Sequence, residues 1–159
     1  MHEPDRLADQ LERSWNGDAW HGPALAELTQ GLSAAQAHRH HLSEAHSIWE
    51  LVLHCTAWVR EVTRRLGGTA PSLPAEGDWP EVGEESEAAW DSARCALQDN
   101  ILSLARTVRG LEPAILDRTV GEGRDAPLGT GTTYYVMLHG VVQHNLYHAG
   151  QIALLRKLA

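Results

Sequence analysis

The sequence predicts an all-α protein built as a four-helix bundle. Four long segments place apolar residues at helical spacing, Gly- and Pro-rich joints separate these segments, and two of the connections are long. A chain of 159 residues has the size of one ordinary domain and can bury a hydrophobic core without disulfide or metal staples. We therefore expect residues 1–159 to form a single helical-bundle domain.

The first predicted helix runs from about Asp5 to Trp15. Its apolar residues recur at helical spacing: Leu7, Leu11 and Trp15. A further turn or two begins at Gly22–Pro23 and stops at Gly31. Ser33, with Gln36 three residues later, has the pattern of a capping box and predicts another short helical piece.

The second long helix has the clearest signals. Ser47 and Glu50 form a capping-box pattern at its start, and Gly67–Gly68 ends it. One helix face carries a long apolar stripe: Ile48, Leu51, Val52, Cys55, Val59, Val62 and Leu66. The following stretch, 71–80, has a proline at each end and a third inside, so it is predicted to be a loop.

The third predicted helix spans roughly Glu84 to Arg109, and Gly110 closes it. Its buried stripe is expected to comprise Trp90, Ala93, Leu97, Ile101, Leu104 and Val108. Residues 116–132 are rich in Gly and Asp, which predicts an irregular or extended connection. The fourth helix is predicted to start at Thr132 or Thr133 and to run to the C-terminus, with Lys and Arg in its last turn as the helix dipole prefers.

The charge balance argues against nucleic acid and anionic membrane surfaces as partners. The chain carries 13 Lys and Arg against 21 Asp and Glu, and its basic residues are scattered. Both of these partners reward clustered basic side chains. The N-terminal stretch contains no apolar run typical of a signal peptide or a membrane span. Cys55 and Cys95 make no disulfide framework, so we expect a cytoplasmic protein.

The pair His144 and His148, in the last predicted helix, is the strongest local sign of chemistry. At about 100° per residue, the two imidazoles lie roughly 40° apart, one turn above the other. Apolar residues share their direction: Met137, Val141, Ile152 and Leu155. An i, i+4 histidine pair can grip one ion, but the glutamate of the HExxH motif is missing, which disfavours a zincin-type protease. A bare HxxxH is weak, because ordinary core packing explains most such pairs.

His54 is the third candidate ligand, at the flank of the second helix's apolar stripe. From its position alone, a half-exposed, hydrogen-bonded histidine and a metal ligand are equally good interpretations. Three imidazoles suit Zn, Ni, Cu and Fe(II) and leave a coordination position open for water or substrate. Cys55 follows His54 but points about 100° away around the helix, into the core stripe, so it is a poor fourth ligand.

The remaining polar candidates have simpler interpretations. His46 is expected at the surface, and His139 is expected to pack or to form a hydrogen bond. Gln151 lies seven residues after His144, nearly in line with it, and is either a hydrogen-bond donor behind a ligand, a substrate contact or a surface residue. Three further histidines are expected in a solvated loop: His38, His40 and His41.

Two segments together resemble a known family. Residues 46–54 read HSIWELVLH, and residues 140–152 read GVVQHNLYHAGQI. One histidine in the second helix, followed by HxxxH and Gly-Gln-Ile in the fourth, is similar to the DinB/YfiT-like superfamily. The likeness extends over most of the chain, including the Leu32–Gln36 piece and the Gly-rich stretch before the last helix.

The resemblance implies a four-helix bundle of up-down-down-up topology, often in a homodimer, with a three-histidine metal site. It assigns His54, His144 and His148 as ligands of one divalent ion, with Zn, Ni and Fe the leading candidates. Relatives include transferases acting with low-molecular-weight thiols and a thiol-dependent maleylpyruvate isomerase. The resemblance therefore implies a small-molecule substrate, a possible thiol cosubstrate, and a metal that activates a thiol or a water.

Three hypotheses follow for the function. The first is a metal-dependent thiol S-transferase or hydrolase that uses a metal-bound thiolate or hydroxide. It predicts a cleft beside the metal, with polar groups such as Gln151 or Tyr147 near it. The second is a non-catalytic metal-binding module of a stress response, which predicts no substrate-sized cavity. The third is that the histidines are structural and bind no metal.

Overall fold

All the regular secondary structure among the described residues is helical, in agreement with the predicted fold class. A computed structural model describes residues 2–121, 123, 125 and 128–159, and these contain no β-strand. In chain order the elements are α1 (Glu3–Trp15), α2 (Leu25–Thr29), α3 (Ala34–His38), α4 (Ile48–Leu66), α5 (Glu87–Arg109), the 3₁₀ turn η1 (Pro113–Ile115) and α6 (Tyr134–Leu155).

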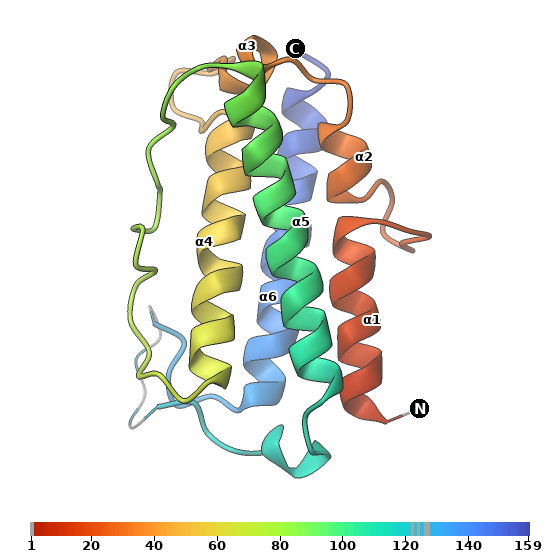
Figure 1. Ribbon diagram of the computed structural model, residues 1–159, viewed down its shortest axis with the longest axis vertical. Coiled ribbons are helices and arrows are strands. Elements are labelled where there is room, and N and C mark those ends of the chain that lie inside the picture. The colour runs from red at the N-terminus through yellow and green to blue at the C-terminus, as the bar shows by residue number, and fades with distance from the viewer. Residues whose placement is uncertain (1, 122, 124, 126–127) are drawn as a thin grey trace.

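Four long helices pack around one core. α1 packs on α5, α5 on α4, and α4 on α6, and α6 closes the ring against α1. In Figure 1, α1 and α6 run up the page, whereas α4 and α5 run down it, and the short helices α2 and α3 lie near the upper end. Because α4 ends at the lower end and α5 begins at the upper end, the connection 67–86 travels the length of the bundle beside α4 (Figure 1).

The long helices start where side chains satisfy their free backbone N–H groups. The Ser47 hydroxyl accepts from the Glu50 backbone N–H at 3.2 Å, and the Glu50 carboxylate accepts from the Ser47 N–H at 2.7 Å, which confirms the predicted capping box. α5 begins at Glu87, later than predicted, because the Ser86 hydroxyl caps Ala89. α1 begins earlier than predicted, at Glu3, because the Asp5 carboxylate accepts from the His2 N–H.

The last helix is shorter than predicted at its C-terminal end, and only part of the connection before it is described. α6 ends at Leu155 and not at the C-terminus, and no basic residue lies in its last turn. Arg156 caps it and donates to the carbonyls of Glu27 and Leu28, which ties this end to α2. Residues 122, 124, 126 and 127 of the predicted irregular connection lie outside the described residues, and the described part includes an isolated bridge between Thr119 and Thr133.

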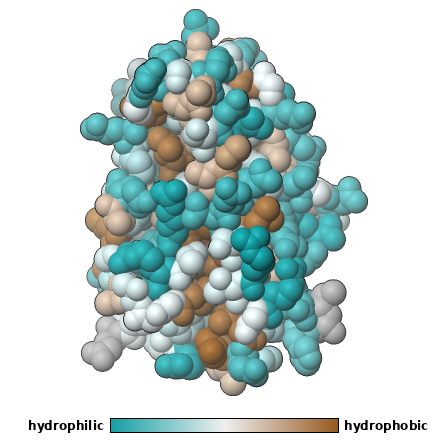
Figure 2. Space-filling model, in the orientation of Figure 1, coloured by the Kyte–Doolittle hydropathy of each residue, from teal (hydrophilic) through white to brown (hydrophobic). Residues whose placement is uncertain are grey.

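The core is apolar and lies between the long helices, as the predicted stripes require. Ile48, Val52, Leu97 and Ile101 are fully buried in it. Trp90 is also fully buried, and its indole N–H donates to the Leu32 carbonyl at 2.9 Å. Figure 2 shows a face dominated by hydrophilic side chains, with only small apolar patches between them. No helix among the described residues is long and apolar enough to cross a membrane.

Candidate metal centre

The three predicted histidines come together between α4 and α6. His54 projects from the middle of α4, and His144 and His148 lie one turn apart on α6. One ring nitrogen of each lies within 4.8 Å of the other two, and the Nε2 atoms of His54 and His144 are 2.9 Å apart. Nitrogens this close, on two rigid helices, form a donor set that could hold one metal ion.

The side chain of His54, at the flank of the apolar stripe of α4, is buried. Only 5% of the residue is exposed, the same fraction as for His148. The connection 67–86 covers it: the Trp79 indole stacks on the His54 ring with centroids 3.9 Å apart and planes 9° apart. The imidazole of His46 also stacks on the Trp79 indole, with centroids 3.5 Å apart. Of the two interpretations left open for His54, the half-exposed histidine does not fit this burial, which comes from a segment distant in sequence.

Two of the three imidazoles are oriented by a hydrogen bond on the nitrogen that faces away from the cluster. His54 Nδ1 lies 2.5 Å from the Asp78 carbonyl oxygen, and His148 Nδ1 lies 2.6 Å from Gln151 Oε1. Carbonyl oxygens only accept, so Nδ1 carries the proton in both rings and Nε2 is left unprotonated. This is the usual arrangement behind metal-ligating histidines. Of the roles weighed for Gln151, the structure supports a hydrogen-bond partner behind the candidate ligand His148, although the Gln151 oxygen accepts the bond.

His144 has a different environment. Its Nδ1 atom is buried and has no hydrogen-bond partner within the described part of the chain, and the same holds for the side-chain amide of the neighbouring Asn145. Burial is the main cause that lowers the pKa of His144 to about 3; the nearby rings of His148 and His54 contribute to the lowering, while Asn145 acts in the opposite direction. Burial is also the main reason that the pKa values of His54 and His148 are lowered. All three rings are therefore neutral at pH 7, the form that binds metal.

A cavity of about 590 Å³ opens beside the cluster and is lined by all three histidines. Most of its remaining wall is apolar, with α6 contributing Val136, Met137 and Val141. This volume falls in the range of small-molecule sites, which are concave, mostly apolar and carry a few convergent polar groups.

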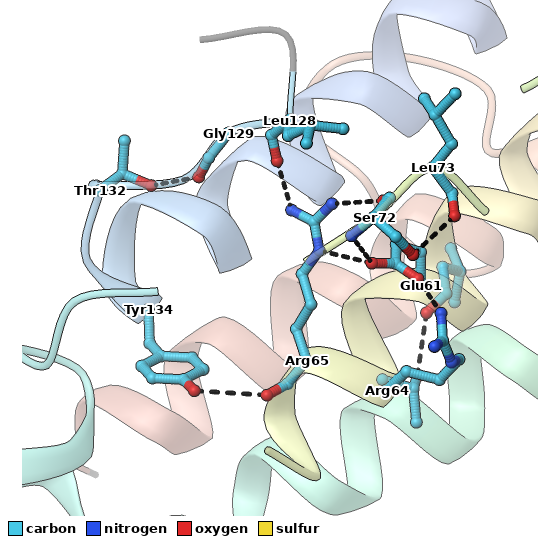
Figure 3. A network of polar contacts seen from close by, with 11 residues as sticks. Glu61, Arg64, Arg65, Ser72, Leu73, Leu128, Gly129, Thr132 and Tyr134 are labelled. Carbon is cyan, nitrogen blue, oxygen red and sulfur yellow. Dashed lines mark hydrogen bonds and ion pairs between the residues drawn. The ribbon is translucent and has the colours of Figure 1, made fainter. Parts of the chain in front are cut away.

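Arg65, which lines the cavity, belongs to a buried ion pair that was not predicted from the sequence (Figure 3). Arg65 Nε donates to Glu61 Oε1 at 2.9 Å, and the two residues are only 3% and 1% exposed. The Arg65 guanidinium also donates to the carbonyls of Leu128 and Ser72, at 2.7 and 3.0 Å. One side chain thus ties two long connections to α4. The available signal was an i, i+4 Glu–Arg pair next to an apolar stripe, which more often lies at the surface.

The other candidates from the sequence lie outside the cluster. His46 and His40 are exposed beside the Glu50 carboxylate, as expected of surface groups. His38 lies in the last turn of α3 and not in a loop, with its ring 2.9 Å from Glu85. His139 packs edge-on against Tyr135, as predicted.

Cys55 is no ligand of this cluster. Its thiol is fully buried in the core stripe, and burial raises its pKa to about 12. Asp78 and Trp79 belong to the site, yet no sequence signal marked them, because they sit in an irregular connection whose path depends on the folded bundle.

The family comparison agrees with this geometry. A model of the DinB superfamily matches residues 19–152, a segment that contains α2 to α5, most of α6 and all three histidines of the cluster. No curated protein and no solved structure matches the chain. Because the family match covers most of the sequence, the chain belongs to the DinB superfamily.

Proposed function

We propose that this DinB-superfamily protein is a metal-dependent enzyme, a thiol S-transferase or a hydrolase, with His54, His144 and His148 as the ligands of one divalent ion. The observation that carries the proposal is the group of three imidazole nitrogens within 4.8 Å of one another, beside a cavity of about 590 Å³. A neutral three-nitrogen set suits Zn, Ni or Fe. Such an ion supplies Lewis-acid chemistry that lowers the pKa of a thiol or a water.

The residues that line the cavity would bind and orient the substrate of this reaction. The apolar side chains of α6 keep water away from one wall of the cavity, and they favour the carbon skeleton of a small-molecule substrate. Tyr147 lines the same cavity and is 67% exposed, so its side chain lies where a substrate enters. A low-molecular-weight thiol cosubstrate is part of the proposal.

The cavity favours an enzyme over the non-catalytic metal-binding module. A module that only stores metal or stiffens the bundle needs no space beside the ligands, whereas all three histidines here face a ligand-sized cavity. A homodimer is also proposed, and it is supported by the exposed apolar side chains of α6: Val136, Tyr147 and Leu154. The cytoplasmic location and the absence of a nucleic-acid partner stay predictions of the sequence.

Metal content tests the ligand assignment directly. We expect elemental analysis to find about one divalent ion per wild-type chain, and a loss of most of it in His148→Ala, because three imidazoles are needed for a site of this kind. His21→Ala is the matched control, since His21 is exposed and lies outside the cluster. A chelator should lower the melting temperature of the wild type and of His21→Ala but not that of His148→Ala. Equal metal content in all three proteins would overturn the assignment.

An activity panel separates the enzyme from the module. We expect the metal-loaded protein to accelerate the reaction of at least one low-molecular-weight thiol with an apolar electrophile, or the hydrolysis of an apolar ester, and His144→Ala to lose that activity. Val136→Trp, at a half-exposed position that lines the cavity about two helical turns from His144, should lose activity while keeping its metal. If wild type is inactive on the whole panel with Zn, Ni and Fe, the module becomes the better interpretation.

A further inference from the structure

His54 stands apart from the other two histidines in how it is held. His144 and His148 belong to one helix, so the backbone of α6 fixes their spacing. His54 alone comes from α4, and the oxygen behind its ring belongs to neither helix but to Asp78 in the connection 67–86. Any contact that fixes Asp78 therefore also fixes the position of His54.

Asp78 is anchored by a tryptophan on the same helix as His54. Trp58 follows His54 by one helical turn, and its indole N–H donates to Asp78 Oδ1 at 2.7 Å. A hydrogen bond from an N–H group to a carboxylate is among the stronger kinds in proteins. Through this bond the Asp78 side chain is held beside α4 while its backbone carbonyl faces His54 Nδ1 at 2.5 Å. The Asp78 carboxylate itself is 3.5 Å from the same nitrogen, on the side away from the cluster, so it is no fourth ligand.

We propose that Trp58 and Asp78 form a latch, and that this latch positions His54 by holding its proton on Nδ1 and its Nε2 toward His144 and His148. Trp58 and Asp78 are thus positioning residues for the metal centre. The latch also explains why Trp79 covers the site, because the residue after Asp78 is delivered onto the face of the His54 ring, where it stacks. The inference rests on the proposed function.

The test removes the Trp58 donor, the Asp78 carboxylate acceptor, or both in one double variant. Trp58→Phe keeps an aromatic ring but removes the indole N–H, and Asp78→Ala removes the carboxylate but keeps the backbone carbonyl. Trp20→Phe is the matched control, because Trp20 is fully exposed. Two properties are measured: the proton position on the His54 ring in the metal-free protein, by long-range ¹H–¹⁵N NMR, and Zn²⁺ affinity, by competition with a chromophoric chelator.

We expect His54 in the wild type and in Trp20→Phe to carry its proton on Nδ1, and each latch variant to show a mixture of both ring forms. Zn²⁺ affinity should fall about 10- to 100-fold in each latch variant, the usual cost of losing a group behind a metal ligand. The double variant should lose no more than either single variant, because both remove the same contact. If Trp58 and Asp78 had a merely structural role, their losses of Zn²⁺ affinity would add in the double variant, and the proton of His54 would stay on Nδ1.

The outcomes separate this inference from the proposed function. If the wild type binds no Zn²⁺, the metal proposal fails, but the NMR measurement still tests the latch. If the wild type binds Zn²⁺ and the latch variants bind it equally well with His54 unchanged, the latch is overturned and the metal proposal stands. Thermal melts of every variant identify any that simply fail to fold.

Discussion

Replacing Arg65 with Met is expected to lower the free energy of unfolding by about 3–5 kcal/mol, the usual cost of removing one partner from a buried ion pair. Glu61 is 1% exposed, and its carboxylate accepts from Arg65 Nε, so the change leaves a buried charge poorly compensated. It also removes the donors to the carbonyls of Ser72 and Leu128. Urea denaturation of the metal-free protein measures the effect.

Arg64→Met is the matched control for this prediction. Arg64 also pairs with the Glu61 carboxylate, but its side chain is 42% exposed, so its loss should cost no more than about 1 kcal/mol. The double variant Glu61→Leu with Arg65→Met removes both charges and should recover part of the loss. Equal destabilisation by Arg65→Met and Arg64→Met would contradict the importance given to the buried pair.

The metal-free protein is expected to lose stability as the pH falls below about 6.5. Burial lowers the pKa of His144 from 6.5 to about 3, and it also lowers those of His54 and His148. Between these folded-state values and 6.5, the unfolded chain binds more protons than the folded one, so lowering the pH favours unfolding. The free energy of unfolding is therefore highest above about pH 6.5 and falls progressively below it. For His144 the slope approaches about 1.4 kcal/mol per pH unit.

Urea denaturation at pH 7.5, 6.5 and 5.5, with chelator present, measures this dependence. Within this range most carboxylates stay ionised, so histidines dominate the change. His144→Gln keeps a polar side chain without a titrating ring and should show a shallower slope than the wild type. His21→Ala, which changes an exposed histidine, should show the wild-type slope. A slope unchanged in His144→Gln would contradict the prediction.

Sequence patterns predicted the parts of the site that depend on a single helix. The i, i+4 spacing places His144 and His148 together wherever α6 forms, and the capping box at Ser47 located the start of α4. The family resemblance, and not the position on the helix, singled out His54. What could not be predicted is what lies against His54, because the path of the connection 67–86 depends on contacts formed after the helices pack.

The buried pair shows the same limit. A charged i, i+4 pair has the same sequence pattern at a surface and in a core, so nothing in the sequence singled out Glu61 and Arg65. They became central only because carbonyls from two separate connections converge on the guanidinium. Local patterns therefore predicted the helices, and long-range contacts decided the surroundings of the cluster.

The helices that carry the three histidines and the connection 67–86 that covers His54 are expected to open at different rates. The three histidines sit on long helices, which open only when the bundle unfolds, whereas the Asp78 carbonyl and the Trp79 ring sit on an irregular segment that we expect to detach locally at a much smaller free-energy cost. Amide protons of this segment should then exchange with solvent well before those of α4 and α6. The rate at which a metal ion or a small molecule enters and leaves the site would then be set by the fast openings of the connection and not by the slow unfolding of the helices.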